Sequence, residues 1–382
     1  MTRLPSLDLY NEAVQHPQVA FTDATLRAGK VRTNGLGLPL ELGGGFANTY
    51  SVTAAGLTYA VRMFHKQAGG LEDRYRLIAT ELLRLSSPYF VQFEYQARGV
   101  RVDGQQYPLV KMEWASGETL GSFLDARYGD RNVVEALRRS FRDLAKHLRD
   151  RGIAHGDLQN GNVMVDGARL RLVDYDGMFV PGMAAANGSE IGHRHFQHPA
   201  RSAKDFGPAM DRFSFIALDL TLAALMERPA LFVKYATTGE NILFTGGDFK
   251  DPGASPIFAE LRAIQSLRKH AEDFAAVCRA GIGSVPEIED FVAGRNIPVV
   301  TVTITTPSST TRLAYAGSLP VIDASDFALA SRHIGDRVEV IGRITDVKHD
   351  LTRRGNREYV FINFGDWRGR IVKVNIWNTG LE

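Results

Sequence analysis

The sequence predicts an α+β protein in which a β-rich segment comes first, a helical segment follows, and a small β-rich segment comes last. Turn-bounded apolar runs typical of strands gather in residues 32–116, and apolar residues at helical spacing dominate residues 117–292. Short alternating runs return after residue 326. Because 382 residues exceed what one hydrophobic core usually supports, we expect at least two domains.

The first segment contains the pattern of a β-hairpin. Two runs rich in β-formers flank residues 54–57, with Gly56 placed where a tight turn needs it. Apolar residues near helical spacing then predict one helix before the segment ends. The elements expected here are strands at 50–53 and 58–64, a helix at 73–85 and a strand at 109–113.

The second segment is predicted to be mostly helical. One amphipathic face is marked by Val133, Leu137, Phe141, Leu144 and Leu148. Residues 213–225 are apolar nearly all round, which indicates a buried central helix. Two short strand-like runs at 162–165 and 170–173 interrupt the helices, with Asp166 and Gly167 as the turn between them.

Composition narrows the class of protein. The chain is 44% apolar and 23% charged, as in ordinary soluble globular proteins. Its net charge of +2 gives no strong overall attraction for nucleic acid or anionic membranes. The single cysteine, Cys278, permits no internal disulfide, and the longest apolar run, residues 213–226, is too short to span a bilayer. We therefore expect a cytoplasmic protein with no membrane contact.

The strongest chemical signal is the run His-Gly-Asp-Leu-Gln-Asn-Gly-Asn at residues 155–162. It supplies Asp157 and, five residues later, Asn162, and Asp174 follows at the end of the second short strand. In a strand–turn–strand arrangement, Asn162 and Asp174 lie beside each other at one end of the hairpin. Two such oxygen donors suit Mg²⁺, which takes few protein ligands and keeps substrate phosphate oxygens and water. A carboxylate to orient the nucleophile and a metal site are the parts that phosphoryl transfer needs.

These residues resemble the catalytic loop and metal motif of the protein kinase family, and the resemblance extends over about residues 32–292 in six stations in the same order. The other four stations are the glycine run at Gly43, Gly44 and Gly45; Arg62 with Glu81; the hinge at Met112–Ala115; and Asp211 before a helix. The resemblance implies a bilobal fold with a β-rich N-lobe and an α-helical C-lobe.

The resemblance also implies a role for each matching residue. Catalysis would be carried by Asp157, which orients the acceptor hydroxyl, with Arg62 clamped by Glu81. ATP would be bound by Gly43, Gly44, Gly45, Arg62, Glu113 and Ala115. Magnesium would be held by Asn162 and Asp174. The implied function is ATP- and Mg²⁺-dependent transfer of the γ-phosphate to a Ser or Thr hydroxyl.

Several positions depart from the family pattern. Arginine at position 62 replaces a lysine, and the two are not equivalent in geometry. Asp174-Tyr175-Asp176 replaces D-F-G, which adds a carboxylate, and Gly156 and Gln159 replace an arginine and a lysine. Two alternatives therefore stay open. One is a pseudokinase that acts as a signalling scaffold. The other is a small-molecule phosphotransferase, because the loop also resembles that of aminoglycoside and choline phosphotransferases.

The last segment resembles the first strands of an OB-fold. Strands are expected at 337–344, 359–364 and 370–377, two strands short of a usual five-stranded barrel. Ten Lys/Arg and six Asp/Glu lie between Ser331 and Asn375, interleaved with aromatic residues. Such surfaces bind single-stranded nucleic acid in OB-folds, so nucleic acid is one expected partner and protein is the other. Kinases joined to such domains resemble bacterial stress-signalling modules that include a phosphatase, which makes a phosphatase a further candidate partner.

The predicted organisation follows from these segments. An N-terminal extension covers 1–31, the kinase-like domain 32–292 with lobes 32–116 and 117–292, a Thr/Ser/Pro-rich linker 293–325, and the OB-like domain 326–382.

Overall fold

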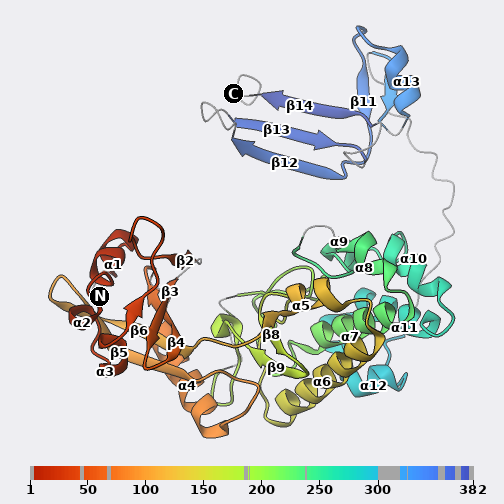
Figure 1. Ribbon diagram of the computed structural model, residues 1–382. Helices are drawn as coiled ribbons and strands as arrows, with labels where there is room; N and C mark the ends of the chain where they lie inside the picture. The colour runs from red at the N-terminus through yellow and green to blue at the C-terminus, as the bar shows by residue number, and fades with distance from the viewer. Residues whose placement is uncertain are drawn as a thin grey trace. The chain divides into compact units, whose positions relative to one another are not determined.

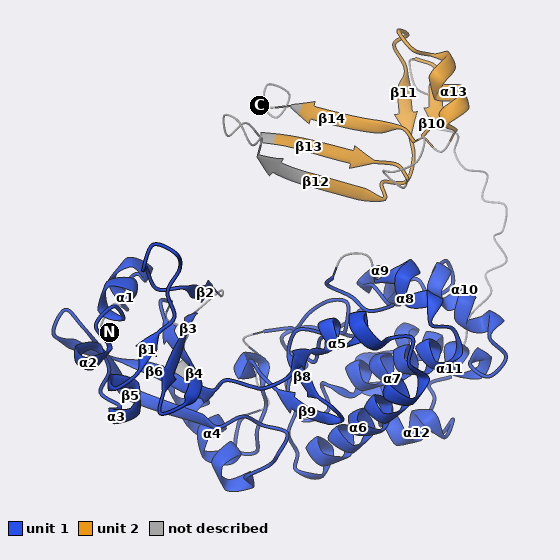
Figure 2. Ribbon diagram, viewed as in Figure 1, with its two compact units in different colours: residues 1–300 blue, residues 301–382 orange. Residues whose placement is uncertain are grey.

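The computed structural model is a mixed α+β structure with two compact units, residues 1–300 and 301–382 (Figure 2). It describes residues 4–43, 47–66, 70–184, 188, 190–236, 239–299, 319–324, 326–351, 358–365 and 371–377. The predicted α+β class is confirmed. Among the described strands, none of the sheets closes into a barrel. No helix in these ranges is both long enough and apolar enough to cross a membrane.

One six-stranded antiparallel sheet forms the first part of unit 1 (Figure 1). Its strands are β1 (Lys30–Val31), β2 (Glu41–Gly43), β3 (Ala47–Ala54), β4 (Leu57–Phe64), β5 (Phe93–Val102) and β6 (Gln105–Glu113). The order is β1-β3-β4-β6-β5, and β2 pairs with the other part of β3. The central position of β4 matters for the site, because this strand carries Arg62.

The predicted hairpin is confirmed as β3 and β4. The two strands pair from Ala47 opposite Phe64 to Ala54 opposite Leu57. The turn residues Ala55 and Gly56 both have positive φ, 50° and 78°, as a two-residue type I′ turn requires. This register places Arg62 opposite Thr49 on one side and Val110 of β6 on the other.

Helix α4 (Leu71–Leu85) matches the helix expected at 73–85. Its buried residues Tyr75, Ile78 and Leu82 recur at helical spacing and so form one face. The Tyr75 ring lies 5.1 Å from that of Phe64 in β4 and 6.0 Å from that of Phe93 in β5, measured between centroids. The helix therefore packs directly on the strands that carry the site.

The predicted N-terminal extension is part of the core of unit 1. It forms α1 (Leu7–Ala13), α2 (Pro17–Ala20) and α3 (Ala24–Arg27). Tyr10, Val14 and Leu26 are buried in one cluster with residues of β3, β4 and β5. The Tyr10 hydroxyl donates to the carbonyl of Phe64 at 2.9 Å. The helices are too short and too interrupted by proline for a strong periodic signal, and they bury themselves through tertiary packing instead.

The second part of unit 1 is helical, as predicted. Its helices are α5 (Leu120–Arg127), α6 (Arg131–Asp150), α7 (Arg212–Glu227), α8 (Ala230–Tyr235), α9 (Gly246–Lys250), α10 (Pro256–Ala263), α11 (Arg268–Arg279) and α12 (Ile288–Val292). Every residue from Phe213 to Leu225 is buried, so α7 is the central helix that the sequence predicted. The one acid in that stretch, Asp219, is forked by Arg138 and Arg142 of α6, with N–O distances of 2.6–3.0 Å.

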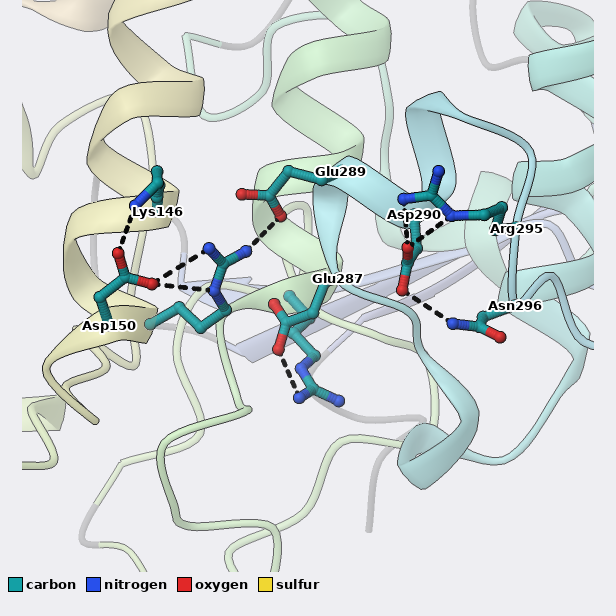
Figure 3. A network of polar contacts seen from close by, with 9 residues as sticks. Lys146, Asp150, Glu287, Glu289, Asp290, Arg295 and Asn296 are labelled. Carbon is teal, nitrogen blue, oxygen red and sulfur yellow. Dashed lines mark hydrogen bonds and ion pairs between the residues drawn. The ribbon is translucent and has the colours of Figure 1, made fainter.

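Ion pairs link α12 and the residue before it to α6 and α7 (Figure 3). Arg149, at the end of α6, pairs with Glu289 at 2.6 Å, and Arg212, at the start of α7, pairs with Glu287 at 2.5 Å. Asp290 accepts hydrogen bonds from the side chains of Arg295 and Asn296. Arg295 and Asn296, which lie in the range predicted to be linker, therefore contact α12.

A small three-stranded sheet also belongs to the second part of unit 1. It contains β7 (Glu118–Thr119), β8 (Val163–Asp166) and β9 (Arg169–Leu172), with the strand order β7-β8-β9. Strands β8 and β9 form the hairpin predicted from the sequence, with Asp166 opposite Arg169. This hairpin connects the 155–162 loop to Asp174.

Unit 2 contains two small sheets in its described residues. Strand β10 (Val321–Asp323) pairs in parallel with β11 (Glu339–Ile341), and α13 (Phe327–Arg332) connects them. The other sheet is antiparallel, in the order β12 (Asp346–Leu351), β13 (Glu358–Asn363) and β14 (Lys373–Trp377).

The strands of unit 2 differ from the prediction in two places. The strand expected at 337–344 is shortened to β11, and the chain pairs again only from Asp346. The range predicted as linker, 293–325, includes β10. Residues 301–318, with most of the Thr/Ser/Pro-rich run, lie outside the described residues. The OB-like closure remains a prediction, because the described strands form open sheets.

Candidate active site

The 155–162 loop joins α6 to β8, and the buried side chain of Asp211 anchors its first residues. Asp211, just before α7, accepts hydrogen bonds from the backbone N–H groups of His155 and Gly156. The His155 ring also contacts the carbonyl of Val173, with an Nε2–O distance of 3.0 Å. Burial raises the pKa of Asp211, and the two backbone donors oppose this. Asp211 therefore fixes the backbone at the start of the loop.

Gly156 stands where the protein kinase pattern has an arginine, and the local backbone gives a reason for the glycine. Its φ is +83°, and a Cβ at this position would overlap the carbonyl oxygen of Gly177. Only glycine fits where the loop and the 176–178 segment approach so closely. The arginine that the family pattern has at this position could not be accommodated here.

Asp157 is held by three donors from both sides of the loop. Its Oδ1 accepts from the backbone N–H of His193 at 2.6 Å. Its Oδ2 accepts from the side-chain amides of Gln159 at 2.7 Å and Asn162 at 2.9 Å. The orientation of the carboxylate is thereby fixed, as a group that orients a nucleophile requires. Gln159, in place of the family lysine, contributes to that orientation.

Asn162 and Asp174 lie at the same end of the β8–β9 hairpin, as predicted. The carbonyl of Asn162 accepts from the N–H of Val173 at 3.0 Å, directly beside Asp174. The side-chain nitrogen of Asn162 donates to Asp157, so its Oδ1 is the atom that could bind a cation. Asp174 has a left-handed backbone with φ of 64°, and its side chain is 45% exposed.

The donor set fits a magnesium site with few protein ligands. It offers one amide oxygen and one half-exposed carboxylate, and magnesium keeps substrate and water oxygens for its remaining positions. In the described part of the chain, no three or more His, Cys, Asp or Glu side chains are arranged to hold a metal ion. A fully protein-enclosed cation site is therefore not found in these residues.

Arg62 reaches the site from β4 and binds two acids. Its Nη1 lies 2.6 Å from Asp174 Oδ1, and its Nη2 binds Asp176 Oδ2. The guanidinium side chain is only 12% exposed. Burial alone would lower the pKa of Arg62, but the negative charges of Asp176 and Asp174 raise it overall.

The prediction that Arg62 pairs with Glu81 is wrong. The Glu81 carboxylate is instead forked by Arg84 of its own helix, at 2.6 and 2.8 Å. Helix α4 presents Arg74 to the site, and Glu81 lies seven residues further on the same stripe, about 10 Å along the axis at 1.5 Å per residue. The position of the helix in the sequence was predicted correctly, but the turn of the helix that faces the site was not.

Three further residues belong to the site and had no assigned role in the sequence prediction. The Tyr75 hydroxyl donates to Asp176 Oδ1. Arg74 donates through Nη2 to the carbonyls of Asp176 at 2.5 Å and Met178 at 2.9 Å. Burial raises the pKa of Glu190 to about 7, helped by the charges of Asp176 and Asp174. The second carboxylate of the Asp-Tyr-Asp motif was the signal that could have led to this cluster.

The predicted ATP-binding residues at the strand ends are placed as follows. Gly43 ends β2 opposite Asn48, and Gly44 and Gly45 lie outside the described residues. Glu113 ends β6, where its N–H donates to the carbonyl of Gln92 and its carboxylate lies 3.1 Å from Arg171. Ala115 is buried two residues later.

Comparison with known proteins gives no family for this chain. No family model matches the sequence, and no curated protein matches it.

Proposed function

We propose that unit 1 is an ATP- and Mg²⁺-dependent phosphotransferase with a bilobal, protein-kinase-like arrangement, acting on a Ser or Thr hydroxyl. The supporting observation is the convergence of Asp157, Asn162 and Asp174 with the cation Arg62 in one connected network. These groups come from the 155–162 loop, the end of β9 and the central strand β4.

Each residue has a distinct task in this proposal. Asp157 accepts a hydrogen bond from the acceptor hydroxyl and orients its oxygen toward the γ-phosphate. Asn162 Oδ1 and Asp174 would hold magnesium, which supplies charge neutralisation for the phosphates when bound. Arg62, whose charge is secured by two acids, would contact the phosphates from the β4 side.

A scaffold without phosphate transfer is the second candidate function. It is favoured by one observation: Asp174, one of the two proposed metal ligands, is paired with Arg62. This ion pair would have to rearrange before Asp174 could hold a metal ion. Thermal stabilisation by ATP and Mg²⁺ without any transfer would support this alternative.

Phosphate transfer from γ-labelled ATP tests the proposal, with autophosphorylation and a generic Ser/Thr peptide mixture as acceptors. We expect Asp157→Ala to lower the transfer rate by about 10²–10⁴-fold, because a positioned acid–base group contributes about that much. Nucleotide binding should survive, since Asp157 faces the acceptor.

The matched control for this assay is Asp166→Ala, which removes an exposed acid at the turn of the same β8–β9 hairpin. Its transfer rate should stay within about twofold of the wild type. Equal transfer by the wild type and Asp157→Ala would contradict the proposal.

A further inference from the structure

We propose that Asp176, and not Glu81, is the acid that positions Arg62 for the nucleotide phosphates, and that helix α4 acts on this pair through Tyr75. The inference rests on the proposed phosphotransfer function of unit 1. Asp176 is a positioning residue in this scheme, because it acts on the reaction only through Arg62.

The Asp176 carboxylate is buried, and each of its two oxygens accepts a hydrogen bond from a named side chain. One oxygen binds Nη2 of Arg62, and the other accepts from the hydroxyl of Tyr75. The side chains of Asp176 and Arg62 are 8% and 12% exposed. A buried carboxylate with a charged donor on one oxygen and a neutral donor on the other is strongly oriented.

Helix α4 holds this contact from its first two turns. The Tyr75 ring is fixed between Phe64 and Phe93, so its hydroxyl has little freedom. Arg74, the preceding residue, binds the carbonyls of Asp176 and Met178 and thereby fixes the backbone that carries the acid. A shift of α4 would move both the carboxylate and its supporting backbone.

The two acids on Arg62 differ in exposure, and this difference gives them different tasks. Asp174 is 45% exposed and would turn to a cation, whereas Asp176 is enclosed. If Asp174 held magnesium, Nη2 of Arg62 would still be bound to Asp176. Asp176 would thus keep Arg62 in position while its Nη1 became available to a phosphate.

The test is a double-mutant cycle on the full-length chain. Asp176→Asn and Arg62→Gln are compared singly and together, with Glu81→Gln as the matched control in α4. We expect Asp176→Asn to lower kcat at least about tenfold with a smaller change in KM, and Glu81→Gln to change kcat less than about twofold. In the Arg62→Gln background, Asp176→Asn should have no further effect, because its action passes through Arg62.

Two results would overturn the inference. One is an equal loss of kcat from Glu81→Gln, and the other is an undiminished effect of Asp176→Asn in the Arg62→Gln background. If Asp176→Asn does not fold, Tyr75→Phe takes its place in the test. It removes a single hydrogen bond to the same carboxylate and should also lower kcat.

The pairing of Arg62 with Asp176 can be tested even if the proposed function is wrong. If the wild type transfers no phosphate, the same cycle is read in the thermal midpoint Tm. Losses for Arg62 and Asp176 that are less than additive then support the pairing, while those for Arg62 and Glu81 should add. Fully additive losses for Arg62 and Asp176 would reject the pairing, whatever the activity.

Discussion

At the scale of single residues, the site concentrates acids around few cations. Burial raises the pKa of Glu190, the negative charges of Asp176 and Asp174 raise it further, and Arg62 opposes the increase. For Asp176 the largest cause is burial, which raises its pKa against the opposing charge of Arg62. Such a concentration is typical of functional sites, where charge is arranged for a ligand and not for stability.

Glu190 should make the stability of the protein depend on pH. Its pKa is about 7 in the folded protein and 4.5 ordinarily, so the folded state holds the proton more tightly. Stability from this group is therefore full below about pH 4.5 and is lost as pH rises toward 7. Glu190→Gln should flatten the curve of Tm against pH between 5 and 8 and raise Tm most at pH 8. Parallel curves for the two proteins would contradict this assignment.

At the scale of elements, the site depends on a close approach between two loops. The 155–162 loop and the 176–178 segment meet at Gly156, under the support of Asp211. The β8–β9 hairpin then sets the distance between Asn162 and Asp174 through its register.

Gly156→Ala should destabilise the protein much more than Gly167→Ala. Both glycines have positive φ, +83° and +63°, which costs an alanine about 1–2 kcal/mol. At Gly167 nothing lies within 4 Å of the added Cβ, whereas at Gly156 it meets backbone and adds an overpacking cost of about 1–3 kcal/mol. Urea unfolding measures both. Equal losses of unfolding free energy would mean that the close approach is not rigid.

At the scale of the whole molecule, the sequence was most informative where periodicity was strong. The β3–β4 hairpin, the buried helix α7 and the β8–β9 hairpin were all predicted, because each carries a local pattern that its own residues determine. The neighbouring positions of Asn162 and Asp174 followed from the hairpin alone.

The errors lie where tertiary packing decides. The partner of Arg62 depends on which turn of α4 faces the site, and no local pattern encodes that register. The burial of Tyr10 and its neighbours depends on a sheet that forms later in the chain. In unit 2 the chain after Ile341 does not continue its strand, although residues 337–344 carry a suitable alternation.

The central claim is that Asn162 and Asp174 form a magnesium–nucleotide site, and isothermal titration of ATP with and without Mg²⁺ tests it most directly. We predict that the wild type binds ATP at least about tenfold more tightly with Mg²⁺, because Asp174 would hold a metal that also neutralises the phosphates. Asp174→Ala should lose that dependence, and Asp166→Ala should keep it. Absence of ATP binding by the wild type, or an unchanged Mg²⁺ dependence in Asp174→Ala, would contradict the account.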